Sequence, residues 1–123
     1  MLKHLTLAAV LFALPAAAQT RDCVSAGILS ADSFSFGTSR IPRDPNDPAS
    51  REQVTATARI RNLTGERVAF SVSFSAPFVM TNFSNGQRFM VGGANVTNVI
   101  LGNVLRGAAS DSAVRGVLRL SCS

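Results

Sequence analysis

The fold is decided by residues 54–75, which read VTATARIRNLTGERVAFSVSFS. From Val54 to Ile60, apolar residues fall at every second position, with threonine and arginine between them. From Val68 to Phe74, apolar residues alternate in the same way with alanine and serine. A period of two is typical of a strand that buries one face. Because Asn62 to Gly65 supplies turn-forming residues between these halves, the stretch predicts two consecutive strands.

The pattern continues toward the C-terminus. Residues 78–83 and 87–91 flank Asn85-Gly86, a dipeptide that suits a type I′ turn, so we predict a hairpin there. Residues 96–105 form an apolar, β-branched run that predicts a buried strand interrupted at Gly102. A final alternating strand is predicted over 114–122.

Two further segments precede residue 54. Cys23 to Leu29 and Ser33 to Phe36 predict one broken strand or two short ones. Residues 40–50 contain three prolines, and because proline cannot donate to a strand ladder, we expect an extended surface loop. About seven short strands separated by turns indicate an all-β antiparallel sandwich.

Residues 1–18 have the layout of a cleavable secretory signal peptide. Lys3 and His4 form a basic head, Leu5 to Leu14 is an apolar run, and three alanines end at Ala18. The apolar run is far shorter than the roughly 20 residues of a membrane span, which disfavours an uncleaved anchor. Cleavage would leave one domain over residues 19–123, exported to the periplasm or the extracellular space and without a membrane span.

The leader contains the chain's only lysine and only histidine, and the whole chain lacks tyrosine and tryptophan. The mature domain would therefore carry eleven arginines and seven acids and no default general base near neutral pH. We expect no enzyme, no catalytic residues and no cofactor. A carboxylate-dependent hydrolase would require two of the seven acids to converge in a cleft. These are Asp22, Asp32, Asp44, Asp47, Glu52, Glu66 and Asp111.

Cys23 and Cys122 lie at opposite ends of the mature chain. In an oxidising compartment such a pair predicts a disulfide. Closing a loop of about 100 residues stabilises a fold by roughly 4–5 kcal/mol at the upper end. A redox Cys-x-x-Cys motif or a zinc site would need closer spacing or more ligands.

The arginines are the candidate ligand-binding residues, because a guanidinium binds phosphate and carboxylate in a bidentate manner. Arg59 and Arg61 are predicted to point outward from an early strand, and Arg115 and Arg119 outward from the last strand. In a sandwich these strands would belong to different sheets, so the two pairs would face opposite sides. Binding to nucleic acid is not expected, because single strands prefer stacking aromatic side chains.

Metal binding is also disfavoured. A calcium site could draw on the oxygens of Asp44, Asn46, Asp47 and Glu52, but the spacing of an EF-hand is missing and these residues are ordinary turn formers. Copper could use Met80 and Met90, which the predicted hairpin places on opposite faces. We therefore expect no metal site.

Several short motifs resemble those of known domains. Phe34-Ser35-Phe36-Gly37-Thr38, then Ile60 to Gly65, Gly92-Gly93 and Gly116-Val117-Leu118 occur in an order similar to Hydin-type or major-sperm-protein-like immunoglobulin domains. The resemblance spans about 90 residues and implies an immunoglobulin-like sandwich of a mostly non-catalytic family. A fainter resemblance is to spore-coat-U-like and pilin-like secreted domains, which also begin with a cysteine shortly before Phe-Gly.

The sequence thus predicts a non-catalytic structural or protein-interaction module of the periplasm or cell surface. Its partner is expected to be another protein, bound through a sheet edge or a loop. The alternative is a binder of an anionic ligand or surface polysaccharide through Arg59, Arg61, Arg115 and Arg119.

Overall fold

The computed structural model describes residues 20–38 and 53–123, which hold eight strands, a 3-10 turn and one short α-helix. The elements are β1 (Arg21–Asp22), β2 (Leu29–Thr38), β3 (Gln53–Asn62), β4 (Val68–Phe74), β5 (Val79–Asn82), β6 (Arg88–Val91), β7 (Val96–Leu105), η2 (Arg106–Ala108), α3 (Asp111–Val117) and β8 (Leu118–Cys122). The predicted signal peptide, the proline-rich loop at 40–50 and the four calcium candidates lie outside the described residues.

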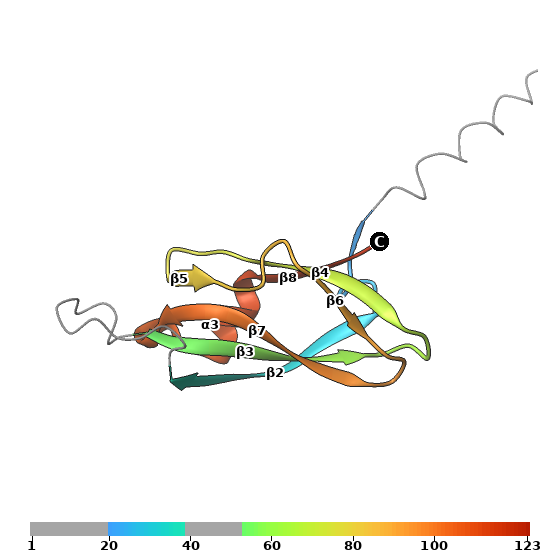
Figure 1. The fold of residues 1–123 in the computed structure, drawn as a ribbon, viewed down its shortest axis with the longest axis horizontal. Helices are drawn as coiled ribbons and strands as arrows, with labels where there is room; N and C mark the ends of the chain where they lie inside the picture. The colour runs from blue at the N-terminus through green and yellow to red at the C-terminus, as the bar shows by residue number, and fades with distance from the viewer. Residues whose placement is uncertain (1–19, 39–52) are drawn as a thin grey trace, which may run out of the picture.

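The strands form two four-stranded sheets that face each other (Figure 1). One sheet has the order β1-β8-β4-β6 and the other the order β2-β3-β7-β5. Every pairing between these strands is antiparallel. The prediction of an all-β antiparallel sandwich is therefore confirmed.

The core lies between the inner faces of the two sheets. On β3, the alternation predicted from sequence is confirmed, since Val54, Ala56, Ala58 and Ile60 are buried and Arg59 is exposed. The largest fully buried side chains come from both sheets and include Phe70, Phe74, Leu101 and Leu120. Alternation succeeds here because successive side chains of a strand point to opposite faces, and one face meets the other sheet.

The predicted hairpin around Asn85-Gly86 is wrong. β5 pairs with β7 and β6 pairs with β4, so the two flanking strands belong to different sheets. A turn does form at these residues, with the Gln87 amide donating to the Ser84 carbonyl at 3.1 Å. It is not the predicted type I′ turn, because Gly86 has a positive φ of 79° and Asn85 does not. Turn propensity is a local property, whereas the choice of neighbouring strand depends on which apolar faces the rest of the chain can bury. Met80 and Met90 are accordingly exposed on strands of separate sheets.

The predicted strand at 114–122 is correct only from Leu118 onward, because residues 111–117 form α3. The Ser110 hydroxyl caps this helix by accepting a hydrogen bond from the Ala113 amide at 3.2 Å. Val114 and Leu118 are both buried, and their spacing of four fits one face of a helix as well as it fits alternation. Residues 23–28, predicted as a strand, form a turn in which the Ile28 amide donates to the Cys23 carbonyl at 2.9 Å.

Cys23 and Cys122 form a disulfide, as predicted, with their Cα atoms 5.3 Å apart and 99 positions separating them in the chain. Both cysteines are buried. Arg21 and Asp22 of β1 pair with Cys122 and Ser121 of β8, so the bridge fixes the start of the described chain to the last strand.

Candidate interaction surfaces

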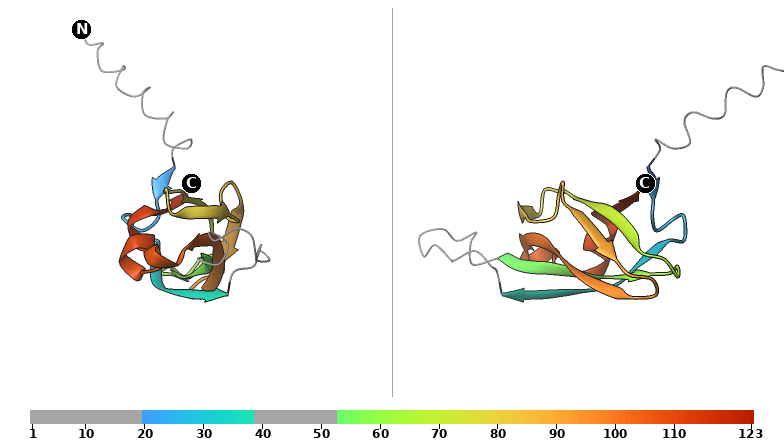
Figure 2. Two further views of the ribbon diagram at one scale, coloured as in Figure 1. Left: turned by 90° about the vertical axis from the view of Figure 1, so that its left-hand side faces the viewer. Right: turned by 45° about the vertical axis from the view of Figure 1, so that its right-hand side comes forward.

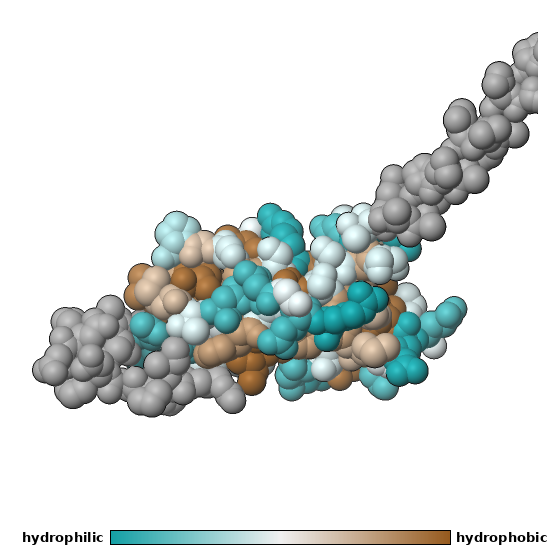
Figure 3. Space-filling view, turned by 45° about the horizontal axis from the view of Figure 1, so that its top comes forward, coloured by the Kyte–Doolittle hydropathy of each residue, from teal (hydrophilic) through white to brown (hydrophobic). Residues whose placement is uncertain are grey.

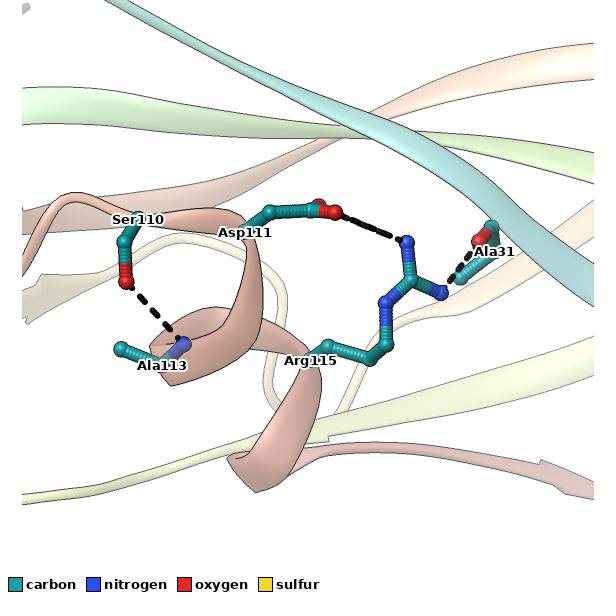
Figure 4. Close-up of polar contacts among 5 residues, drawn as sticks. All are labelled: Ala31, Ser110, Asp111, Ala113 and Arg115. Atoms are coloured by element: carbon teal, nitrogen blue, oxygen red, sulfur yellow. Dashed lines mark hydrogen bonds and ion pairs between the residues drawn. The ribbon is translucent and has the colours of Figure 1, made fainter.

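One side of the sandwich is closed by α3, which packs against β2 (Figure 2, left). Arg115 of α3 donates from Nη1 to the Ala31 carbonyl at 2.6 Å, and its guanidinium lies over the Phe34 ring at 4.9 Å. Asp111 holds the same guanidinium from the preceding helical turn, with 3.3 Å between Nη2 and Oδ2 (Figure 4). Because β2 is an edge strand, Arg115 occupies a carbonyl that could otherwise accept a hydrogen bond from a foreign strand.

The first half of β2 is protected in a second way. The register between β2 and β3 shifts between Ala31 and Ser33, which makes Asp32 part of a bulge. The Asp32 carboxylate accepts hydrogen bonds from Ser30 Oγ at 2.6 Å and from Arg61 Nε at 2.7 Å. The hydrogen bond from Ser30, followed by that from Arg61, lowers the pKa of Asp32, so the carboxylate stays charged. A bulge and a fixed charge both discourage edge-to-edge pairing.

β6 lies on the opposite side of the sandwich from α3 (Figure 2, left). Within the described part of the chain, β6 pairs with β4 alone. On β7, the partner β5 reaches only Gly102 to Val104, and the Phe83 amide adds one bond to the Leu101 carbonyl at 3.0 Å. Residues 96–100 of β7 therefore have a paired strand on the β3 side only, so two strand edges face the same open side.

An apolar groove of about 420 Å³ lies between these two edges. Its lining residues are Phe83, Gln87, Phe89, Asn98, Val99 and Ile100. Ile100 is 37% exposed and Met90 of β6 is 55% exposed, whereas Phe89 stacks on the buried Phe70 with 5.7 Å between ring centroids. Figure 3 shows apolar side chains at the surface in the half of the molecule that carries β5 and β7. We call this groove, together with the free edge of β6, the open groove.

The four arginines predicted to bind an anion do not form one patch. Arg61 pairs with Asp32, and Arg115, which lies on α3 and not on a strand, pairs with Asp111. Arg119 donates to the carbonyls of Gly116 and Leu118 at 3.1 and 2.8 Å. Arg59 is exposed on the outer face of β3 beside a shallow hollow lined by serine, threonine and asparagine. The structure brings together only Arg115 and Arg119, which line a hollow of about 190 Å³.

Three other arginines line one hollow, and no pattern in the sequence predicts that they lie together. Arg21, Arg67 and Arg88 line a hollow of about 460 Å³ at the end of the sheet β1-β8-β4-β6. They are far apart in the sequence, and two of them stand beside an exposed acidic residue, Arg21 beside Asp22 and Arg67 beside Glu66. We call this feature the arginine hollow.

Among residues 20–38 and 53–123, no three acidic, cysteine or histidine side chains are grouped as a metal site would require. Nor does any helix in these two ranges have the length and apolar character needed to cross a membrane. Comparison with protein-family models, with curated proteins and with solved structures finds no match to the chain.

Proposed function

We propose that this protein is a non-catalytic, exported interaction module that binds an extended segment of a partner protein in the open groove. The observation that carries the proposal is the asymmetry between the two sides of the sandwich. On the closed side, a bulge, an ion pair and the Arg115 contact protect the edge of β2. On the open side, β6 and residues 96–100 of β7 present edges above an apolar groove.

The partner segment would add as a strand beside β6. Main-chain hydrogen bonds to an edge strand supply affinity in this binding mode, and pockets for alternate side chains supply specificity. Every second side chain of the added strand would point into the groove and contact Phe83, Phe89 and Ile100. An extended apolar segment is therefore the chemistry that fits this surface.

The proposed location follows from the sequence and from the cysteines. Residues 1–18 have a signal-peptide pattern, and the two cysteines are joined in a disulfide. Disulfides persist in oxidising compartments such as the periplasm and the cell surface, which supports export.

Site-specific photo-crosslinking tests the proposal. A benzophenone side chain replaces Ile100, which lines the open groove and is 37% exposed, and in a matched control it replaces Leu63, which is 53% exposed at the end of β3. We expect an adduct from the exported fraction with the Ile100 probe and not with the Leu63 probe. The partner identified in this way should then slow amide hydrogen exchange in residues 88–91, and not in residues 29–34 of β2. Equal adducts from both positions, or protection confined to other strands, would contradict strand addition at β6.

The alternative function, binding of an anionic ligand through Arg59, Arg61, Arg115 and Arg119, stays a prediction. Arg59 supports it, because its guanidinium has no hydrogen-bond or ion-pair partner among the residues described. It predicts salt-sensitive binding that is abolished by replacing Arg59 and Arg61, or Arg115 and Arg119, with glutamine. The open groove is the better supported site, since three of these four guanidinium groups already hold partners within the chain.

A further inference from the structure

We propose that the arginine hollow binds the phosphate group of a small phosphate monoester, which would be a second site independent of the open groove. The volume of about 460 Å³ falls within the roughly 300–1,000 Å³ typical of small-molecule sites. Three arginines from separate segments line it, namely Arg21 of β1, Arg67 just before β4 and Arg88 of β6.

The guanidinium groups of these three arginines have no partner within the described residues. Those of Arg21, Arg67 and Arg88 form neither an ion pair nor a hydrogen bond, whereas those of Arg61, Arg115 and Arg119 do. Glu66 lines the same hollow, but its carboxylate lies beyond ion-pair distance from each of the three guanidinium groups. Figure 1 shows β1 beside the C-terminus of the chain.

The charge of the lining side chains specifies the ligand. Three arginines and one glutamate leave an excess of two positive charges. A phosphate monoester carries about −1.5 to −2 at neutral pH, and its oxygens match the donor fork of a guanidinium. Ile28, Val68 and Ala69 complete the wall and give an organic group apolar surface to contact, which inorganic phosphate could not use.

Interactions within the chain hold the segments that line the arginine hollow in place without a ligand. The buried Asn62 holds the turn before Arg67 with two hydrogen bonds. Its Nδ2 donates to the Glu66 carbonyl at 2.7 Å, and its Oδ1 accepts from the Thr64 amide at 2.8 Å. Gly93 packs so closely against Gly65 that a Cβ at position 93 would collide with the Gly65 carbonyl. On the other wall, the disulfide at Cys122 holds β8 beside the strand that bears Arg21. Fixed walls reduce the entropy lost when a ligand binds.

Calorimetric titration with glucose 6-phosphate, inorganic phosphate and glucose tests the site. We expect saturable binding of one glucose 6-phosphate per chain, at least about threefold weaker binding of inorganic phosphate and no binding of glucose. Arg67→Gln and Arg21→Gln should each lower the affinity for glucose 6-phosphate at least about tenfold, because a charge-assisted hydrogen bond is lost. Arg106→Gln is the matched control, since it removes one exposed arginine that has no partner among the described residues and lies outside the hollow. This control should stay within about twofold of the unaltered protein.

Three outcomes would overturn the proposal. Non-saturable titrations would show that there is no site, and an equal loss in Arg106→Gln would show that only net charge matters. Equal affinity for inorganic phosphate and glucose 6-phosphate would exclude recognition of the organic group. Arg21 and Arg67 lie on separate elements, so one variant remains informative if the other fails to fold. Neither residue lines the open groove, so the two sites can fail independently.

Discussion

At the residue scale, Asn62 organises one end of the sandwich. Its side chain is 2% exposed. Its Nδ2 lies within hydrogen-bond distance of the carbonyls of Glu66, Val91 and Gly92 at 2.7 to 3.1 Å, and its Oδ1 accepts from Thr64. The sequence identified this asparagine as a turn former, which is correct but incomplete. Asn62 is buried because residues 91–92 pack against it, and the sequence around Asn62 does not predict this long-range contact.

Replacing Asn62 with alanine should therefore be costly. The change leaves several buried carbonyls without a donor, and each buried polar group without a partner costs about 1–3 kcal/mol. We expect Asn62→Ala to lower the free energy of unfolding by about 3 kcal/mol or more in urea titrations. Asn98→Ala, at an exposed position of β7, is the control and should change it by less than about 0.5 kcal/mol. A loss below about 1 kcal/mol for Asn62→Ala would contradict this account.

Asp32 makes the stability depend on pH. Hydrogen bonds from Ser30 and then Arg61 lower its pKa from the ordinary value of 3.8. A carboxylate with a lowered pKa in the folded state contributes stability above its ordinary pKa, and that contribution is lost as the pH falls through the folded value. We expect the free energy of unfolding to fall more steeply below pH 3.8 in the unaltered protein than in Asp32→Asn. A carboxyl carbon NMR titration should place the pKa of Asp32 below 3.8, and Ser30→Ala should raise it toward that value. A pKa at or above the ordinary value in the unaltered protein would exclude the effect.

At the element scale, α3 protects an edge as well as closing the core. Val114 is fully buried beneath it, while Arg115 reaches the Ala31 carbonyl of β2. Arg115→Ala would free that carbonyl and remove the contact with Phe34. We expect a loss of about 1 kcal/mol in unfolding free energy and concentration-dependent self-association in analytical ultracentrifugation. Arg59→Ala, which leaves the β2 edge covered, should remain at the oligomeric state of the unaltered protein. Equal behaviour of the two variants would show that Arg115 does not protect the edge.

The same elements show how far sequence reasoning reaches. β3, β4 and β7 were predicted nearly to the residue, because one face of each strand is buried and the alternation records it. α3 does not follow from alternation, because Val114 and Leu118 fit a helix and a strand equally well, and the only local sign of the helix is the cap at Ser110. The sheet order was not predictable, because the pairing of β6 with β4 instead of β5 is a non-local choice.

The candidate sites were harder to predict than the fold. An interaction through a sheet edge was expected, but which edge is free depends on where α3 and the Asp32 bulge lie. The arginine hollow exists because the order β1-β8-β4-β6 places Arg21, Arg67 and Arg88 around one hollow. Composition revealed an excess of arginine, and only the three-dimensional arrangement distinguishes the arginines with internal partners from those without.

At the scale of the whole molecule, the disulfide joins segments that little else holds together. β1 is two residues long and pairs only with β8 among the described strands, and the bridge fixes the adjoining Cys23 to the end of β8. The two proposed sites therefore depend on the bridge differently. The arginine hollow takes Arg21 from β1, whereas the open groove is built from β6, β7 and the segment between β5 and β6.

Removing the disulfide should thus weaken the fold and one site while sparing the other. The bridge spans 99 positions, and a loop of that length stabilises a fold by about 4–5 kcal/mol in the chain-entropy model, as an upper-end value. We expect the Cys23→Ala, Cys122→Ala double variant to lose several kcal/mol of unfolding free energy in urea. At temperatures where it remains folded, it should bind glucose 6-phosphate more weakly, because Arg21 is no longer held in place. Its crosslinking through the Ile100 position should persist, since Ile100 lies on β7, in the sheet that contains neither β1 nor β8. Loss of both activities in a variant that is still folded would show that the two surfaces form one coupled unit.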